Sequence, residues 1–180
     1  MVIADTLVAV KAELDIASAI TTFDTDLTAF VGRGIKRLFP YVQAEMIDET
    51  VTIAPGANTF TLPVGLESVR FMYDADGYRV EDFIQHDREI IMSELPAEGT
   101  MKIYGNGRFT LATLPEEYEE AVIYYTCALF YSQLAGSKRK YNAYMASGAS
   151  SVDSMRDMAQ WYEERGNTYL QDRGVLLGLE

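Results

Sequence analysis

Apolar residues recur along this chain with two different periods, and the change of period divides it into three regions. In the first region an apolar face repeats at helical spacing, carried by Leu27, Phe30, Val31, Ile35 and Leu38. Asp24 or Thr25 is the expected N-cap of this helix, and Pro40 limits its end. A shorter amphipathic pattern precedes it, so residues 1–49 are predicted to be helical.

In the second region, residues 50–114, the period shortens to that of a strand. Short runs rich in β-branched and aromatic residues are separated by "PGAN", "DADG" and "GNG", in which Gly and Asn favour turns. We expect the "GNG" at 105–107 to be the turn of a last hairpin, whose alternating apolar residues are Ile103, Phe109 and Leu111. About six or seven short strands at this spacing predict a small antiparallel sheet or sandwich.

The third region is helical again. Pro115 suits the first position of a helix, and the acidic residues that follow it suit the positive end of the helix dipole. Two apolar stripes lie side by side up to Gly136, formed by Tyr118, Val122, Tyr125 and Leu129 and by Ala121, Tyr124, Ala128 and Tyr131. A helix that is apolar over most of its circumference is predicted to be the centre of a bundle.

A last amphipathic helix is expected from about residue 150 to 173. The predicted class is therefore α+β, with a helical bundle (1–49 and 115–173) interrupted by an inserted antiparallel β subdomain (50–114) and followed by a tail (174–180). The residues predicted to form the bundle core are Leu27, Phe30, Val122, Tyr125, Leu129, Tyr162 and Tyr169.

Composition narrows the function classes. With 48% hydrophobic and 23% charged residues, the chain has the balance of a globular protein. Its net charge is -12, and each of the three regions is negative, so no region is rich in basic residues. The lack of excess Lys and Arg argues against binding to phosphate backbones. The N-terminus has no basic region before its apolar residues, so we expect no signal peptide. The longest uncharged stretch, 121–136, is too short and too polar to span a bilayer, and no membrane association is expected.

Candidate chemistry is sparse. Cys127 is the only cysteine, which excludes an internal disulfide and a thiolate metal site, and it is expected to be a small buried hydrophobe. His86 is the only histidine, in an acidic segment where a solvated side chain is the simplest interpretation. No Walker A, G-x-G-x-x-G or G-x-S-x-G motif is present. We expect no catalytic, cofactor-binding or metal-binding residues, no cofactor and no enzymatic activity.

Three segments together resemble the head–tail connector, or adaptor, proteins of tailed bacteriophages. They are "ITTFDTDLTAFVGRGIKRLFP", the strand block "TFTLPVGLESVRFMYDADGYRV" and "GRFTLATLPEEYEEAVIYYTCALFY", followed by a last amphipathic helix. The tail tubular proteins of short-tailed phages are similar in the same way. The resemblance covers about 20–173, and no invariant catalytic motif defines the family.

This resemblance implies a structural protein of the virion neck, made in the host cytoplasm, that forms a closed ring of about twelve copies below the portal. It implies that portal protein and a stopper or tail protein are its partners, and that DNA passes through the ring without specific binding. A negatively charged channel wall suits that passage because it repels phosphate. The tail would bind the portal through Gly174, Val175, Leu176, Leu177, Gly178, Leu179 and Glu180.

Two alternatives stay open. The chain could be another ring of the tail, such as a tail tubular or tail-completion protein. It could also be a small ligand-binding module or enzyme in which Tyr124, Tyr125, Tyr131 and His86 converge on a cavity. A structure in which those tyrosines pack between helices would count against the second alternative.

Overall fold

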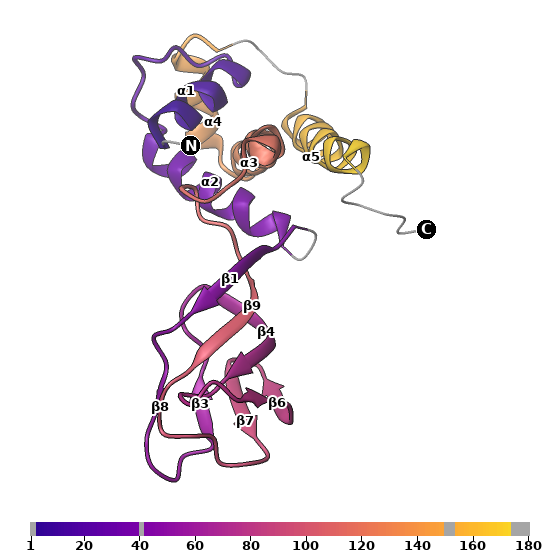
Figure 1. The fold of residues 1–180 in the computed structure, drawn as a ribbon. Helices are drawn as coiled ribbons and strands as arrows, with labels where there is room; N and C mark the ends of the chain where they lie inside the picture. The colour runs from indigo at the N-terminus through magenta and orange to yellow at the C-terminus, as the bar shows by residue number, and fades with distance from the viewer. Residues whose placement is uncertain (1–2, 40–41, 150–153, 174–180) are drawn as a thin grey trace. The chain divides into compact units, whose positions relative to one another are not determined.

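The computed structural model describes residues 3–39, 42–149 and 154–173. The chain divides into two compact units: a helical unit made of Met1–Val42 and Phe109–Glu180, and a β unit made of Gln43–Arg108. All described α-helices lie in the first unit and all described strands in the second, with the strands pairing antiparallel (Figure 1). The predicted α+β class is confirmed.

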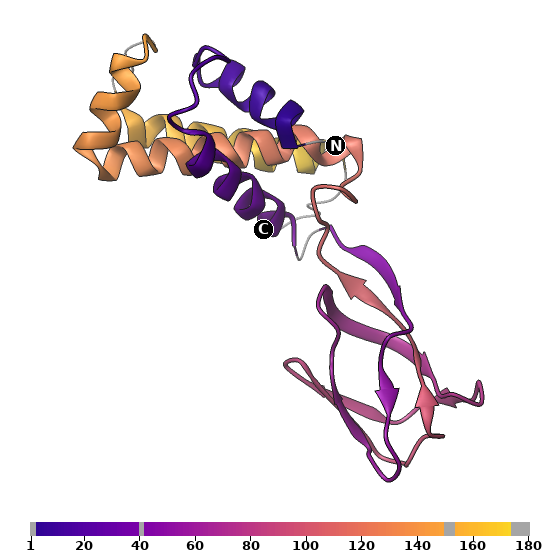
Figure 2. The ribbon, with the colours of Figure 1, turned by 90° about the vertical axis from the view of Figure 1, so that its left-hand side faces the viewer.

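The helical unit is built around one long helix. In chain order its elements are α1 (Ile3–Glu13), α2 (Asp24–Leu38), the 3-10 turn η1 (Glu116–Tyr118), α3 (Glu119–Gly136), α4 (Lys138–Ala146) and α5 (Met155–Asp172). Helix α3 contacts each of the other four α-helices, and α5 runs along its length (Figure 2). Its buried positions occur all around the helix, in agreement with the two adjacent apolar stripes of its sequence.

Two glycines set how closely the flanking helices approach α3. A Cβ added at Gly34 of α2 would lie 3.1 Å from the backbone oxygen of Val122. One added at Gly166 of α5 would lie 2.9 Å from Cε1 of Tyr125. A side chain at either position would push the helices apart, so the missing Cβ explains glycine in two helix interiors where it is otherwise unfavourable.

Helix α2 begins differently from the prediction. Its first residue is Asp24, and its N-cap is Phe23, which makes no side-chain cap bond. The Asp24 carboxylate instead pairs with Lys11, with Nζ and Oδ1 2.6 Å apart, and the Lys11 ammonium also donates to the Ser18 carbonyl at 3.3 Å. The prediction of Asp24 or Thr25 as N-cap was wrong because Asp24 is held by an ion pair to a preceding helix.

The β unit contains three antiparallel sheets. Their strand orders are β1-β9-β4-β5, β3-β7-β6 and β2-β8. The strands are β1 (Ala44–Asp48), β2 (Thr52–Ile53), β3 (Thr59–Thr61), β4 (Leu66–Tyr73), β5 (Arg79–Val80), β6 (Phe83–His86), β7 (Glu89–Met92), β8 (Gly99–Thr100) and β9 (Lys102–Gly107). Buried apolar side chains from all three sheets form one core: Ile53, Leu62, Leu66, Met72, Ile90, Met92, Met101 and Ile103.

The segment "GNG" is part of a strand, so its prediction as a hairpin turn was wrong. Residues 105–107 lie in β9, which pairs with both β1 and β4. A Cβ at Gly105 would lie 2.1 Å from the Ser68 oxygen, and one at Gly107 would lie 2.2 Å from the Gly65 oxygen. Glycine is needed here for a close approach of β4, whose register shifts twice along this pairing.

The last predicted strand is also absent. Residues 108–114 form no strand, and Phe109 and Leu111 instead pack against a buried cluster of the helical unit. The observed β unit is Gln43–Arg108, whereas 50–114 was predicted. It starts earlier because β1 supplies a strand before residue 50, and it ends earlier because 108–114 form no strand. The alternating pattern therefore marked a connection with a turn at 110–113, whose apolar side chains pack with the helical unit.

Candidate functional site

The tyrosines of α3 are used for helix packing. The ring of Tyr131 stacks on that of Tyr162 in α5, with centroids 5.6 Å apart and planes 12° apart. The Tyr144 hydroxyl of α4 lies 3.3 Å from that of Tyr131 and donates to the Leu14 carbonyl at 2.9 Å. The Tyr125 hydroxyl donates to Oδ1 of Asn167 at 2.7 Å. These hydroxyls connect α3 to its neighbours and satisfy polar groups that packing has removed from water.

Burial also fixes the charge of these groups. Desolvation raises the pKa of Tyr131 and of Tyr162, and it raises the pKa of Tyr124 to about 12. The Tyr124 hydroxyl donates to the Glu120 carboxylate, which also disfavours its ionisation. Burial raises the pKa of the Cys127 thiol, which lies inside the helical core. At neutral pH these side chains are uncharged, so they supply neither a thiolate nor a phenolate nucleophile.

The predicted core residues lie in the helical unit at different depths. Those that are buried are Leu27, Phe30, Val122, Tyr125 and Tyr162. Leu129 and Tyr169 are half-buried and pack at the edge of the core. The predicted portal-binding residues, 174–180, lie outside the described residues.

The predicted alternative cavity combines groups from both units. Tyr124, Tyr125 and Tyr131 pack between helices. His86 is exposed at the end of β6 in the β unit, opposite Glu89 in the register of β6 and β7. Among the described residues no group of three His, Cys, Asp or Glu side chains is placed to hold a metal ion. The arrangement therefore gives this alternative no support.

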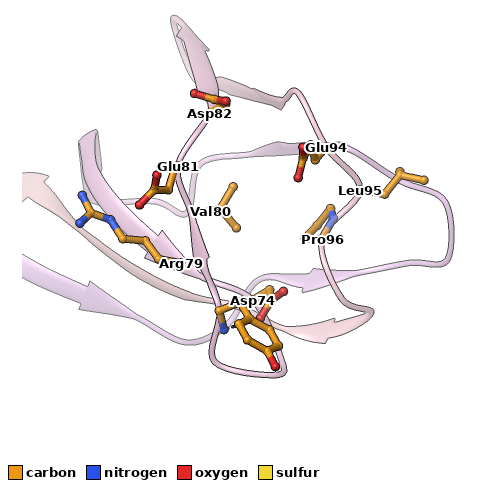
Figure 3. Close-up of a pocket in the computed structure, with 9 residues that line it drawn as sticks. Asp74, Arg79, Val80, Glu81, Asp82, Glu94, Leu95 and Pro96 are labelled. Carbon is orange, nitrogen blue, oxygen red and sulfur yellow. Dashed lines mark hydrogen bonds between the residues drawn. The ribbon is translucent and has the colours of Figure 1, made fainter.

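The β unit carries a pocket of about 320 Å³ between two loops (Figure 3). We call it the loop pocket; it is lined by Asp74, Tyr78, Arg79, Val80, Glu81, Asp82, Glu94, Leu95 and Pro96. Its first wall is the turn between β4 and β5 together with the chain up to β6, and its second is the chain that follows β7.

Asp74 builds this pocket. Its Oδ1 accepts hydrogen bonds from the backbone N–H groups of Asp76 and Tyr78, at 3.1 and 2.8 Å, and so closes its own turn. Its Oδ2 accepts from the N–H of Ala97 at 3.3 Å, which ties the turn to the second wall. The sequence signal was available in "DADGY", because an aspartate that opens a glycine-containing turn commonly bonds to its own backbone.

The loop pocket is lined by acidic side chains and by exposed apolar ones. The carboxylates of Glu81, Asp82 and Glu94 make no ion pair within the part of the chain that the structure describes. Tyr78 and Leu95 are 73% and 66% exposed, and Figure 3 shows the Leu95 side chain directed away from Val80. Large exposed apolar side chains beside charged ones are typical of interaction sites. The excess of negative charge favours a cationic protein surface over a phosphate.

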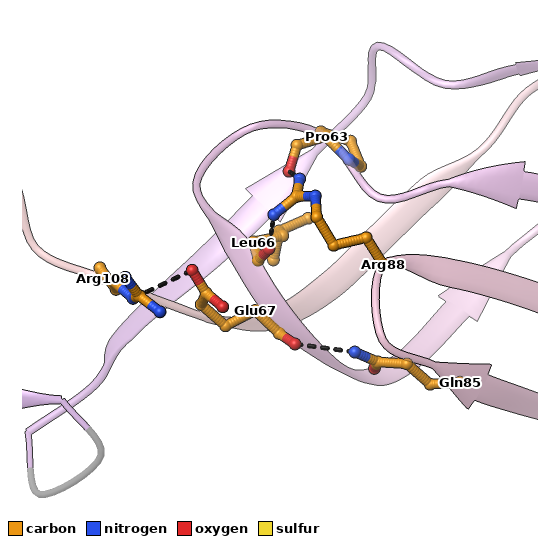
Figure 4. A network of polar contacts seen from close by, with 6 residues as sticks. All are labelled: Pro63, Leu66, Glu67, Gln85, Arg88 and Arg108. Atoms are coloured by element: carbon orange, nitrogen blue, oxygen red, sulfur yellow. Dashed lines mark hydrogen bonds and ion pairs between the residues drawn. The ribbon is translucent and has the colours of Figure 1, made fainter.

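A second polar network in the β unit joins Arg88 and Gln85 to backbone groups of residues 62–69 (Figure 4). The Arg88 guanidinium donates through Nη2 to the carbonyls of Leu62 and Pro63, at 2.6 and 2.8 Å, and through Nη1 to that of Leu66 at 3.4 Å. The Gln85 amide donates to the Glu67 carbonyl at 2.7 Å and accepts from the Val69 N–H at 3.1 Å. Sequence reasoning missed both residues, because their partners are backbone groups far away in the sequence.

No family model matches this sequence, and a search of curated proteins found no match. Within 3–39, 42–149 and 154–173, no helix combines the length and the apolar character needed to cross a membrane.

Proposed function

We propose that this chain is a virion structural protein without enzymatic activity, a head–tail connector (adaptor) of a tailed bacteriophage. In this proposal copies of the chain form a ring below the portal, join the head to the tail and line the DNA channel. The resemblance implies about twelve copies in this ring, and a closed ring would repeat one interface between neighbouring copies. Portal protein lies on one side and a stopper or tail protein on the other.

One observation carries the proposal. Helix α3, whose tyrosines would line the cavity of the ligand-binding alternative, uses its tyrosines and its cysteine for packing against neighbouring helices. Around the loop pocket, large apolar side chains are instead exposed beside the carboxylates of Glu81, Asp82 and Glu94, which form no ion pair with any described residue. In this proposal the side chains of the core serve only for packing, and the exposed apolar and acidic side chains around the loop pocket contact another protein.

We also propose that the helical unit is a bundle and that the β unit is a sandwich inserted into it. The helical unit consists of two stretches that flank residues 43–108 in the sequence, which supports an insertion. Two sheets contribute to a shared core, with Met72 and Ile103 from the four-stranded sheet and Ile90 and Met92 from the three-stranded one. A shared core between two sheets is the basis of sandwich packing.

Charge supports the same role. The net charge of -12 is compatible with a wall that passing DNA does not adhere to. The segments that resemble adaptor proteins correspond to α2, to the β3–β5 region and to the passage from β9 through η1 into α3. Residues 174–180, which include Val175 and three leucines, are the proposed portal contact.

Deletion of residues 174–180 tests the proposal. The truncated chain should retain the helical content and thermal stability of the full chain but should no longer bind purified portal in a native mass measurement. A second variant, in which Leu176, Leu177 and Leu179 become Ser, keeps the length of the chain. It should also fail to bind if the leucine side chains make the contact. Normal portal binding by both variants would contradict the tail assignment.

The position of the protein in particles separates the proposal from its alternative. Labelled protein directly beneath the portal supports an adaptor, whereas label further down the tail identifies a tail tubular or tail-completion ring. Absence of the protein from purified particles would contradict both.

A further inference from the structure

Helices α2 and α5 each pack one face on α3 and expose the opposite face to solvent. Figure 1 looks along α3 and shows α2 and α5 on different sides of it. The outermost positions of α2 repeat every three or four residues, which places them on one helix face: Thr25, Ala29, Gly32 and Lys36. The same spacing recurs on α5, at Asp157, Trp161, Glu164 and Thr168. We call these two exposed rows the α2 face and the α5 face.

The α2 face is flat and cationic. Gly32 lies inside the helix, and a Cβ added there would have nothing within 4 Å. Unlike Gly34, it is therefore not required by packing within the described part of the chain, although glycine is less favourable than alanine in a helix interior. Arg33 and Lys36 are exposed beside it, and neither forms an ion pair with any described residue.

The α5 face is bulky and acidic. Trp161 is 47% exposed, with the Arg165 guanidinium 5.0 Å from its ring centre. Asp157 and Glu164 lie on either side of it along the face, and within the described residues neither has a cationic partner. The one side-chain bond of Glu164 is accepted from the neutral Gln160 amide at 2.8 Å.

We infer that the α5 face of one copy docks on the α2 face of the next copy, and that this contact is the repeating interface of the ring. The inference rests on the proposed ring function. Trp161 would cover the flat surface at Gly32, and the acids beside Trp161 would meet Arg33 and Lys36. A partly exposed tryptophan that becomes buried is typical of an interface centre.

The contact is necessarily head-to-tail. Two copies meeting through the same α2 face would bring Lys36 against Lys36, and two α5 faces would bring acids together, which is unfavourable. Because the complementary faces lie on different helices of one copy, each copy keeps one face free after the first contact. Such a heterologous contact continues until rotation closes the ring.

Site-directed cross-linking of the full chain tests this arrangement. A chain carrying both Ala29→Cys and Thr168→Cys, treated with a flexible bis-maleimide, should give a ladder of covalent multimers. An equimolar mixture of the two single variants should stop at dimers, and each single variant alone should stay monomeric. A control chain with Val8→Cys in place of Ala29→Cys should stay monomeric too, because Val8 is 55% exposed on α1 and belongs to neither face.

Charge reversal gives a second measurement that introduces no cysteine. Lys36→Glu or Glu164→Lys alone should weaken self-association by about tenfold or more in sedimentation, because each places like charges together. Combining both in one chain should restore association. A missing ladder, a ladder from the control pair, or single reversals that associate like the native chain would overturn the inference.

The two proposals fail separately. A chain that forms the ladder but never occurs in particles keeps this interface and contradicts the connector function. A chain found beneath the portal whose cysteine pair gives no ladder keeps the function and contradicts the interface.

Discussion

Gly166 of α5 lies directly against the ring of Tyr125 in α3, close enough that a methyl group would lie 2.9 Å from Cε1. The Tyr125 hydroxyl is held at the same time by Asn167, the next residue of α5, at 2.7 Å. One ring is thus fixed by contact on its edge and by a hydrogen bond at its tip. This pair sets the spacing and the register of the two longest helices.

Gly166→Ala should destabilise the chain by about 1–3 kcal/mol, because the added methyl group overpacks the α3–α5 contact. Chemical denaturation followed by circular dichroism measures the change. Gly32→Ala is the matched control: its Cβ meets nothing, so it should stabilise the monomer by roughly 0.5–1 kcal/mol through helix propensity. Equal effects at both glycines would contradict this account of the packing.

Tyr125→Ala should cost about 3–5 kcal/mol, as expected for truncation of a large buried ring. Leu129→Ala should cost less, under about 2 kcal/mol, because Leu129 is half-buried at the edge of the core. Tyr125→Phe keeps the ring, removes the hydroxyl that donates to Asn167, and should cost about 1 kcal/mol. Urea denaturation of the three variants would show this order, and a Leu129 cost above that of Tyr125 would contradict it.

Alkaline pH should unfold the helical unit. Tyr124, with a pKa of about 12, and Tyr131 and Tyr162, with raised pKa values, hold their protons more tightly when folded than in the unfolded chain, where the pKa is about 10. Their contribution is complete below pH 10 and is lost as the pH rises through the folded pKa values. Tyrosinate absorbance and helical signal should therefore change together.

The combination of Tyr131→Phe and Tyr162→Phe removes two of these protons and should move that alkaline transition to higher pH. Tyrosinate formation at an unchanged helical signal in the native chain would show that these rings ionise without unfolding.

Arg88→Ala should destabilise the β unit by about 2 kcal/mol, because it leaves the carbonyls of Leu62, Pro63 and Leu66 without their charged donor. Hydrogen exchange of residues 62–69 should accelerate. Arg88→Lys should rescue only partly, since an ammonium cannot match the fork of a guanidinium. Gln85→Ala is a useful comparison, because it removes neutral hydrogen bonds to Glu67 and Val69 of strand β4. Unchanged exchange in the Arg88 variants would show that the network is dispensable.

The helical unit was largely predictable because its signals are local. Pro115, the acids after it and the two apolar stripes up to Gly136 all lie within one segment, and the structure places η1 and α3 there. The β unit was less predictable, because Gly105 and Gly107 are explained by close contacts with Ser68, Gly65 and Met46, which lie far before them in the sequence. Pattern alone likewise could not show that Phe109 and Leu111 pack with helices.

The candidate site was mostly beyond prediction for the same reason. The loop pocket requires Asp74 to reach Ala97, and the two exposed helix faces become visible only once α2 and α5 are both packed on α3. What could be foreseen was the absence of recognisable catalytic motifs, together with the suitability of α3 for packing.

The pairing of Ala44 with Gly107 has a consequence for how the chain folds. These residues lie one position inside the two ends of the β unit, and they are opposite each other in the neighbouring strands β1 and β9. Contacts such as Gly34 with Val122 join segments far apart in the sequence, which makes loop closure slow and entropically costly. Once β1 and β9 pair, the intervening chain is already closed, and α2 and α3 are in effect joined by a short connection. The β unit can therefore vary in length and in its loops without lengthening the search by which the helices find one another.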